Sequence, residues 1–255
     1  MGLRIQIPGL VVQNPVGFNP PVGRGLNGLF FFTGGDGAAA LRNLALDASD
    51  PRYAGTLVGT PTFAADGVIT TQGAHYIDTL VPDSVLGTTI MVARNEDTPS
   101  SVIVPFATCW SDDPGDAYSG NVGESLMQRA AGSITTTIGI VGTGGPPAVA
   151  QGRADLAVAD MLAWHIYAGG YDGTGRWVQD LTTPGNPKTY SASTAKLPNA
   201  VRTWLVGSSA AGVTGAGRGR VAAFVRHDVA LTDEELATWC AFCRAHPRMA
   251  ALGAF

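Results

Sequence analysis

The residues best suited to bind a ligand lie close together between positions 109 and 121. This stretch contains three aspartates, two aromatic residues and an asparagine, namely Trp110, Asp112, Asp113, Asp116, Tyr118 and Asn121. Aromatic faces can stack on sugar rings, while carboxylates and amides bond to sugar hydroxyls. Closely spaced oxygen ligands would also suit Ca²⁺, but Asp, Pro and Gly are equally ordinary turn formers. We predict a carbohydrate-binding loop at these six residues, with a solvated acidic turn as the alternative, and no metal or cofactor.

A second group with reactive side chains is Trp239-Cys240-Ala241-Phe242-Cys243. Two cysteines at this spacing form redox sites when a helix N-terminus activates one thiolate. Here Thr232 and Glu235 form a capping-box pattern that places the helix start two turns earlier, so the cysteines fall in mid-helix. A zinc site would need more ligands than the nearby His246 supplies. We therefore predict that both thiols pack in the core as small apolar groups.

The composition limits the fold and the partners. The chain has 255 residues, of which 14% are charged, and it contains 34 glycines and 16 prolines. Many glycines and prolines among short apolar runs are typical of short strands joined by tight turns. The formal net charge is -4, whereas nucleic-acid binding requires a basic field. The nearest basic group, Arg218, Arg220 and Arg226, is interpreted as a solvated strand end. We predict neither nucleic-acid binding nor membrane insertion.

The elements that must position these residues are mostly strands. Eleven apolar or alternating runs are predicted as strands, at residues 29–32, 55–58, 67–71, 75–79, 88–94, 101–108, 133–141, 162–169, 176–181, 202–206 and 219–226. One helix is predicted over residues 232–246, with Leu236, Trp239, Cys240 and Cys243 on its buried face. The sequence therefore predicts an all-β antiparallel sandwich with one C-terminal α-helix. Trp164, Trp177 and Trp204 are expected in its core.

The organisation along the chain is simple. Residues 1–27 hold four prolines and no lasting period, which predicts an extended N-terminal arm that contacts the body or a partner. Residues 28–255 are predicted to form one domain, with the helix at 232–246 included. The first residues lack a continuous apolar segment and a small-residue cleavage site, so we expect no signal peptide. Three cysteines are too few for a disulfide framework, which favours folding in a reducing compartment.

Three stretches carry a resemblance to a known family. Trp164-His165 opens a strand that ends in Tyr171-Asp172-Gly173, and the chain returns through Trp177-Val178-Gln179-Asp180. Residues 46–63, with a polar loop leading into Gly-Thr-Leu, and residues 221–236, a strand followed by a short helix, occur in the matching order. Together they resemble the concanavalin A-like, laminin-G-like jelly rolls. The resemblance implies the jelly-roll fold and spans residues 28–243.

The resemblance also sets expectations for activity. Hydrolases of this fold carry Glu-x-Asp-x-x-Glu on one strand, a pattern that does not occur here, where the glutamates are Glu96, Glu124, Glu234 and Glu235. We therefore predict no enzymatic activity. Such jelly rolls are common on bacteriophage-like particles, so the resemblance implies a protein of a fibre, spike or capsid appendage that binds host surface glycan.

Two other functions stay open at this point: a purely structural decoration or cement protein, and a polysaccharide-degrading enzyme. On the leading interpretation the protein is made in the bacterial cytoplasm and is located at the surface of a virion or phage-like particle. Its partners are host surface polysaccharide, other virion proteins contacted through the N-terminal arm, and copies of itself, by analogy in a trimer.

Overall fold

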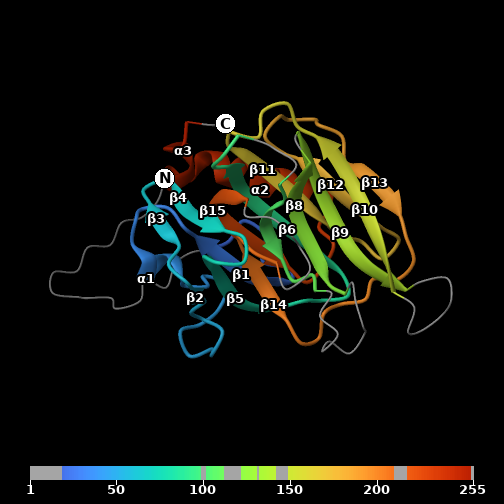
Figure 1. Ribbon diagram of the computed structural model, residues 1–255, viewed down its shortest axis with the longest axis horizontal. Helices are drawn as coiled ribbons and strands as arrows, with labels where there is room; N and C mark the ends of the chain where they lie inside the picture. Colours follow the sequence, from blue (N-terminus) through green and yellow to red (C-terminus); the bar gives the residue numbers. More distant parts are fainter. Residues whose placement is uncertain are drawn as a thin grey trace.

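Two antiparallel β-sheets packed face to face form the body of the protein (Figure 1). The computed structural model describes residues 19–98, 102–111, 122–130, 132–141, 149–209 and 217–253. The eight-stranded sheet runs in the order β13 (Thr189–Ala192), β12 (Gly175–Asp180), β11 (His165–Tyr171), β6 (Gly87–Asn95), β15 (Arg218–His227), β4 (Gly67–Thr71) and β3 (Thr62–Ala64), with β1 (Leu26–Phe31) also paired to β15. The seven-stranded sheet runs in the order β10 (Val149–Ala157), β9 (Ser133–Val141), β8 (Glu124–Ala130), β7 (Val104–Thr108), β14 (Thr203–Val206), β5 (Tyr76–Pro82) and β2 (Thr56–Val58).

This architecture confirms the predicted antiparallel sandwich, and each of the eleven predicted strands overlaps an observed one. The hairpin of β11 and β12 closes at Asp172, whose carboxylate accepts hydrogen bonds from the backbone N–H of Thr174 and Gly175 at 2.9 Å. Gly173 adopts a φ of +99° in that turn, a region open mainly to glycine. The Asp-Gly pair therefore closes the hairpin as its residue types predict.

Four strands were not predicted: β3, β8, β10 and β13. The sequence of β10, Val-Ala-Gln-Gly-Arg-Ala-Asp-Leu-Ala, is poor in the β-branched and aromatic residues that favour strands. It is nevertheless extended because all nine of its residues pair with β9. Strand β8 likewise lies between β7 and β9. Tertiary pairing decides the structure of these segments, and intrinsic propensity does not.

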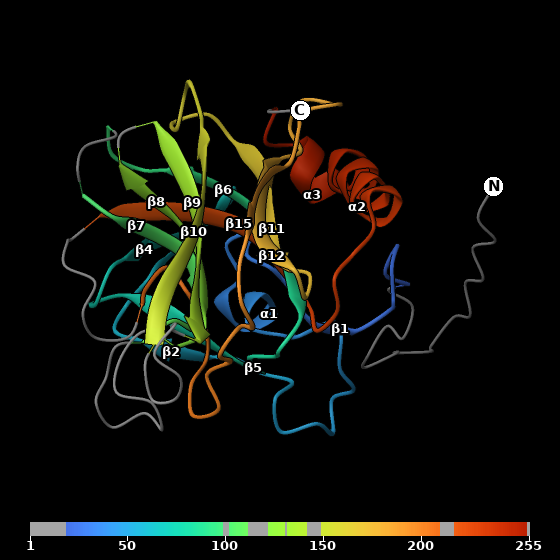
Figure 2. The ribbon, with the colours of Figure 1, turned by 90° about the vertical axis from the view of Figure 1, so that its right-hand side faces the viewer.

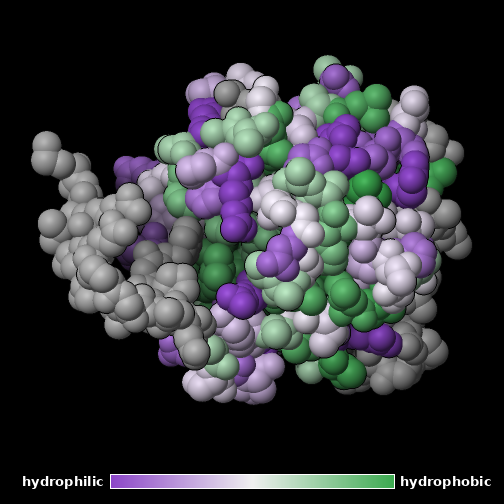
Figure 3. Space-filling view, turned by 90° about the vertical axis from the view of Figure 1, so that its left-hand side faces the viewer, coloured by the Kyte–Doolittle hydropathy of each residue, from purple (hydrophilic) through white to green (hydrophobic). Residues whose placement is uncertain are grey.

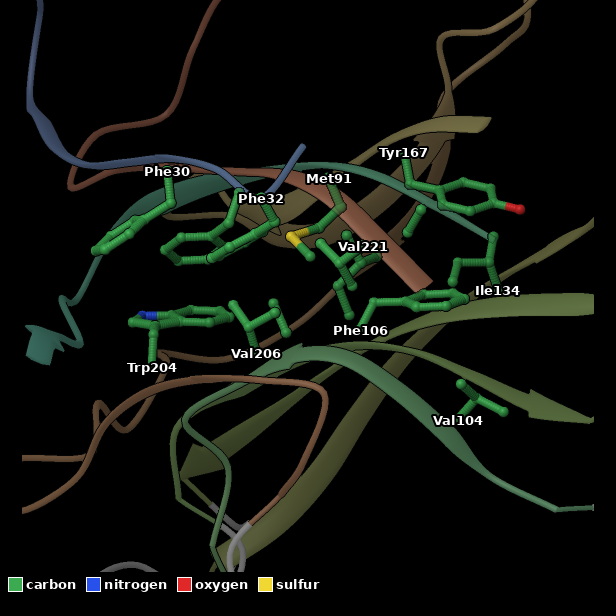
Figure 4. Packing of buried hydrophobic residues seen from close by; sticks show 14 of the residues in the cluster. Phe30, Phe32, Met91, Val104, Phe106, Ile134, Tyr167, Trp204, Val206 and Val221 are labelled. Carbon is green, nitrogen blue, oxygen red and sulfur yellow. The ribbon is translucent and has the colours of Figure 1, made fainter. Parts of the chain in front are cut away.

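The main core fills the space between the two sheets. It includes large aromatic side chains from both layers, and Figure 4 shows Phe30, Phe32 and Tyr167 of the eight-stranded sheet above Phe106 and Trp204 of the seven-stranded sheet. The rings of Phe106 and Tyr167 lie 5.9 Å apart and almost parallel. Trp204 is fully buried, which confirms its predicted place in the core.

A second apolar layer lies on the far side of the eight-stranded sheet, where the helix α2 (Asp233–Ala245) and the short α3 (Pro247–Ala250) cover it (Figure 2). Thr232 caps α2, and both hydrogen bonds of the predicted capping box with Glu235 are present. Buried Leu236, Trp239, Cys240 and Cys243 form the inward face, as predicted. Trp164 and Trp177 belong to this layer. A further four-residue helix, α1 (Gly37–Ala40), is capped at its N-terminus by Asp36.

The described part of the N-terminal arm contacts this helical layer. Val22 belongs to the apolar cluster under α2, and the Arg24 guanidinium hydrogen-bonds to Glu235 at 2.5 and 2.9 Å. Strand β1 begins at Leu26, two residues before the predicted domain boundary. Residues 1–18 of the predicted arm lie outside the described residues.

The surface reflects the small share of charged residues. On the side that carries α1, β2 and β3, hydrophobic and hydrophilic side chains lie next to one another (Figure 3). Leu57 and Val58 of the edge strand β2 are both exposed there. Among the described residues, none of the helices has both the length and the apolarity needed to cross a bilayer.

Candidate functional site

The predicted carbohydrate-binding loop extends from the ends of β7 and β8. Ser111 and Val122 form an isolated bridge with backbone hydrogen bonds of 3.0 and 3.1 Å, so the two chain segments continue side by side beyond the strands. Trp110 lies at this base and is only 7% exposed. Asp112, Asp113, Asp116, Tyr118 and Asn121 lie outside the described residues. The structure thus places the base of the loop, and sugar binding by these six residues stays a prediction.

Directly behind this base lies a group of four buried charges that the sequence analysis did not find: Asp83, Glu124, Lys196 and Arg226. Their side chains are at most 1% exposed. The Lys196 Nζ donates to Asp83 Oδ1 and to Glu124 Oε2, both at 2.7 Å. Arg226 donates to Glu124 from Nη1 at 3.3 Å and to Asp83 from Nη2 at 3.4 Å. Two cations and two anions therefore close into one neutral buried quartet.

The quartet joins the two sheets at the end of the sandwich that carries the predicted loop. Glu124 opens β8 in the seven-stranded sheet, whereas Arg226 lies near the end of β15 in the opposite sheet. Lys196 forms an isolated β-bridge with Ile140 of β9. Asp83 follows β5, and its carboxylate accepts a hydrogen bond from the backbone N–H of Asn199. The quartet therefore ties together the ends of β5, β8, β9 and β15.

The charges of the quartet favour the ionised forms of Asp83 and Lys196. Burial alone would raise the pKa of Asp83, but the positive charges of Lys196 and Arg226 outweigh burial and hold that pKa below its ordinary value. Burial alone would lower the pKa of Lys196, but the two carboxylates raise it instead. Arg226 also stacks over the Trp204 ring at 4.5 Å. The quartet is thus a charge-balanced buried ionic network, in which the Nε of Arg226 has no hydrogen-bond partner.

The prediction that Arg218, Arg220 and Arg226 form a solvated strand end is wrong for Arg220 and Arg226. Arg226 is buried in the quartet, and Arg220 is mostly buried between Asp66 and Glu96, with nitrogen to oxygen distances of 2.6 Å. Only Arg218, which pairs with Asp97, is well exposed. The partners lie more than a hundred residues away in the chain, so no local pattern could reveal them.

A smaller polar pair joins His165 to Asp180 across the β11 and β12 hairpin. The Nδ1 of His165 lies 2.8 Å from Asp180 Oδ2, and its Nε2 lies 2.7 Å from the backbone oxygen of Asp160. Since both ring nitrogens face acceptors, the doubly protonated imidazolium is favoured. Burial alone would lower the pKa of His165, but the hydrogen bond and charge of Asp180 raise it above the ordinary value. The contacts give His165 a structural role in the hairpin.

The His165 and Asp180 pair predicts a pH dependence of stability. Because its pKa is raised, His165 contributes fully below pH 6.5 and loses its contribution as the pH rises through the folded-state value. The pKa of Asp180 is lowered, since the hydrogen bond from His165 overcomes burial, so its contribution is lost as the pH falls below about 4. We expect the stability difference between the native protein and His165→Gln to be largest between about pH 4 and 6.5. Urea unfolding at several pH values measures it, and a difference independent of pH would contradict the pairing.

The three cysteines are free and buried, as the packing prediction requires for Cys240 and Cys243. Burial raises the pKa of the Cys243 thiol to about 12. Burial also raises the pKa of Cys240, whose Sγ lies 3.1 Å from the backbone oxygen of Leu181. Such thiols are protonated at neutral pH and are poor nucleophiles. Within the described ranges, no three His, Cys, Asp or Glu side chains are grouped as metal ligands.

Comparison with known proteins identifies a shared fold. No protein-family model matches the chain, and no curated protein matches it in sequence. Among solved structures, the binding domain of botulinum neurotoxin DC in complex with SialylT has a TM-score of 0.59 at 7% identity, covering 86% of this chain and 52% of that one. The botulinum neurotoxin serotype G binding domain gives a TM-score of 0.56 at 9% identity, with 85% and 51% covered. This chain therefore spans about half the length of the neurotoxin domains it matches.

A third similar structure is matched over nearly its whole length. Domain 4 of AbnA, a GH43 extracellular arabinanase from Geobacillus stearothermophilus, in complex with arabinotriose, has a TM-score of 0.53 at 16% identity. The match covers 83% of this chain and 96% of that domain. The class that the fold defines is thus a jelly-roll β-sandwich domain with a C-terminal helix. At these identities the likeness establishes the fold alone.

Proposed function

We propose that this chain is a non-enzymatic carbohydrate-recognition protein. The observation that carries the proposal is the fold, which two solved domains of different proteins share: a neurotoxin binding domain in complex with SialylT and an arabinanase domain in complex with arabinotriose. Because function depends on the site and not on the fold, the described side chains must also be consistent with binding.

The described polar groups support binding over catalysis. A glycosidase needs one carboxylic acid and one carboxylate that both reach the sugar. Here Asp83 and Glu124 are shielded from solvent and bonded to Lys196 and Arg226. The ring nitrogens of His165 are both engaged. These groups are structural, and they hold the strand ends from which residues 112–121 extend.

The proposal includes a setting and a partner. The glycan belongs to a host cell surface, and the protein is displayed on a virion or phage-like particle, as a fibre, spike or capsid appendage. This setting rests on the family resemblance of the sequence. Detection of the protein in purified particles by mass spectrometry tests it, and absence from every particle fraction would contradict it.

The central experiment is a glycan array with the purified full chain. We expect specific retention on a subset of glycans with no shortening of the bound polymer on sizing columns. Products of shorter length would establish a polysaccharide-degrading enzyme instead. No retention at all, together with particles that lose stability when the protein is deleted, would establish a structural decoration or cement protein.

The predicted loop has its own test. Trp110 is a poor target because it is buried, so alanine there lowers stability whatever its role. Tyr118→Ala combined with Asp116→Ala should weaken binding to the array's best glycan by about tenfold, as expected when an aromatic contact and its polar neighbour are lost. Tyr190→Ala is the matched control, since Tyr190 is 45% exposed on β13, an edge strand of the other sheet from β7 and β8. Equal binding by both variants would remove the loop from the site.

A further inference from the structure

His227, the last residue of β15, connects the eight-stranded sheet with both the helix α2 and the N-terminal arm. The residue is fully buried. The indole Nε1–H of Trp239, on α2, donates to His227 Nε2 at 2.9 Å, and His227 Nδ1 lies 2.8 Å from the backbone oxygen of Arg24. One buried imidazole ring therefore bonds to two segments that lie outside the sheet.

These two contacts determine which ring nitrogen of His227 carries the proton. An indole N–H can only donate a hydrogen bond, so the Nε2 that faces Trp239 must be unprotonated and accept. A backbone oxygen can only accept, so the Nδ1 that faces Arg24 must carry the hydrogen and donate it. The surroundings of His227 are thus complete for a neutral imidazole.

A second proton on this ring would place two donors against each other. Its hydrogen on Nε2 would point at the Trp239 N–H, and the positive ring would face the electropositive edge of the indole. The two rings meet at an interplanar angle of 73°, so the imidazolium does not lie over the negative face of the indole, as a cation-π contact requires. Protonation therefore breaks the bond between β15 and α2, whereas the bond to Arg24 can persist.

The charged groups that act on His227 come from three segments. Arg24 of the arm and Arg226 of β15 are positive, and Glu235 of α2 is negative. Strands β1 and β6, which pair with β15 on either side, place uncharged residues opposite His227. Burial lowers the pKa of His227 below its ordinary value, and the charge of Arg226 acts in the same direction. These effects outweigh the hydrogen bond to the Arg24 oxygen and the charge of Glu235, which raise that pKa.

Other polar contacts of α2 keep their protonation in mild acid. Cys240 Sγ lies 3.1 Å from the backbone oxygen of Leu181, and Arg244 Nη2 lies 3.3 Å from the same oxygen. A thiol loses its proton in alkaline solution, and a guanidinium stays charged throughout the accessible range. The bond from Trp239 to His227 is different, because a single proton taken up in mild acid removes it.

We propose that His227 is an acid-sensitive latch between the eight-stranded sheet and α2, which loosens the helix and the arm bound to it when the ring takes up a proton. The arm follows α2 because Arg24 pairs with Glu235, and the hydrogen bond from Arg24 lowers the pKa of Glu235 to about 2. The hairpin of β11 and β12 keeps its polar pair in acid, because His165 has acceptors at both ring nitrogens. Acid therefore acts on the helical layer, whichever ligand the protein binds.

The expected size of the effect follows from the uptake of one proton. When α2 is open, the ring binds a proton with the ordinary pKa of about 6.5, whereas in the closed state it does so only at lower pH. The stabilising contribution of neutral His227 is thus fully present above about pH 6.5 and is lost as the pH falls. The open fraction should increase by up to about tenfold for each pH unit below 6.5, until the folded-state pKa is reached, and then level off.

The test follows the Trp239 indole N–H by hydrogen exchange in the full chain between about pH 4 and 7.5. Each rate is divided by that of free tryptophan at the same pH, and the signal is assigned from its absence in Trp239→Phe. We expect the opening of this bond to increase with acid as described. The imidazole nitrogen shifts of His227 should show a proton on Nδ1 at neutral pH and a titration below pH 6.5. A proton on Nε2, or a titration at or above pH 6.5, would overturn the proposal.

His227→Gln removes the titrating group and keeps the hydrogen bonds. Its amide oxygen can accept from Trp239 and its N–H can donate to Arg24, so the opening of α2 should no longer respond to acid through this residue. His246→Gln is the matched control, because His246 caps the end of α2 and its ring stacks on Phe31 at 4.6 Å, in the same layer. The control should retain the response. Its loss in His246→Gln, or its persistence in His227→Gln, would count against His227.

Trp239→Phe separates the hydrogen bond from packing and decides the question if His227→Gln fails to fold. Phenylalanine keeps an aromatic ring in the apolar layer but has no N–H, so His227 Nε2 no longer faces a donor. The pKa of His227 should then move up toward its ordinary value, as measured by the imidazole shifts. An unchanged titration of His227 in this variant would show that the bond to Trp239 does not control its protonation, and the proposal would be wrong.

Discussion

Replacing Lys196 by methionine should cost about 3–5 kcal/mol in the free energy of unfolding. The substitution removes the ammonium group that lies 2.7 Å from both Asp83 Oδ1 and Glu124 Oε2. Arg226 would then be the one cation left in the quartet, with its guanidinium nitrogens 3.3 Å from Glu124 Oε2 and 3.4 Å from Asp83 Oδ1. Leaving a buried charge without its partner costs far more than the intact network contributes to stability. Equilibrium unfolding in urea should therefore show a large decrease in the free energy of unfolding.

The matched control is Lys188→Met. Lys188 also pairs with an aspartate at 2.8 Å, but Asp233 is 85% exposed. Exposed ion pairs contribute only about 0–1 kcal/mol, so the control should lose little. Similar losses in the two variants would contradict the description of the quartet as a buried network that holds the sheets together.

The second large effect is expected at Trp204, where alanine should cost about 3–5 kcal/mol. Trp204 is fully buried. Its ring centroid lies 6.0 Å from that of Phe224, on the opposite sheet, and 4.5 Å from the Arg226 guanidinium. The variant loses apolar contacts, leaves a cavity between the sheets and removes a cation-π partner from the quartet.

The control for Trp204→Ala is Tyr190→Ala, which also removes an aromatic ring but at a residue that is 45% exposed. Thermal and urea unfolding are measured for both variants. The tyrosine variant should lose about 1 kcal/mol or less. A thermal midpoint for Trp204→Ala within a few degrees of the native value would show that packing between the sheets gains little stability from this ring.

Several features of the fold follow directly from local sequence. Alternating residues in 133–141 predict an antiparallel strand with Ile134 inward, because a strand turns successive side chains to opposite faces, and β9 has this arrangement. Thr232, Glu235 and the buried face that begins at Leu236 fix the helix, since capping and helical periodicity act over a few residues. Asp172-Gly173 closes the hairpin for an equally local reason.

The tertiary structure alone decided which distant residues meet. Arg226 and Glu124 are 102 positions apart in the chain and Lys196 and Asp83 are 113 apart, so their charges give no pattern that a window of residues could detect. The extended form of β10 depends on pairing with β9. Local forces determine the elements, whereas the quartet depends on how the sheets pair and pack.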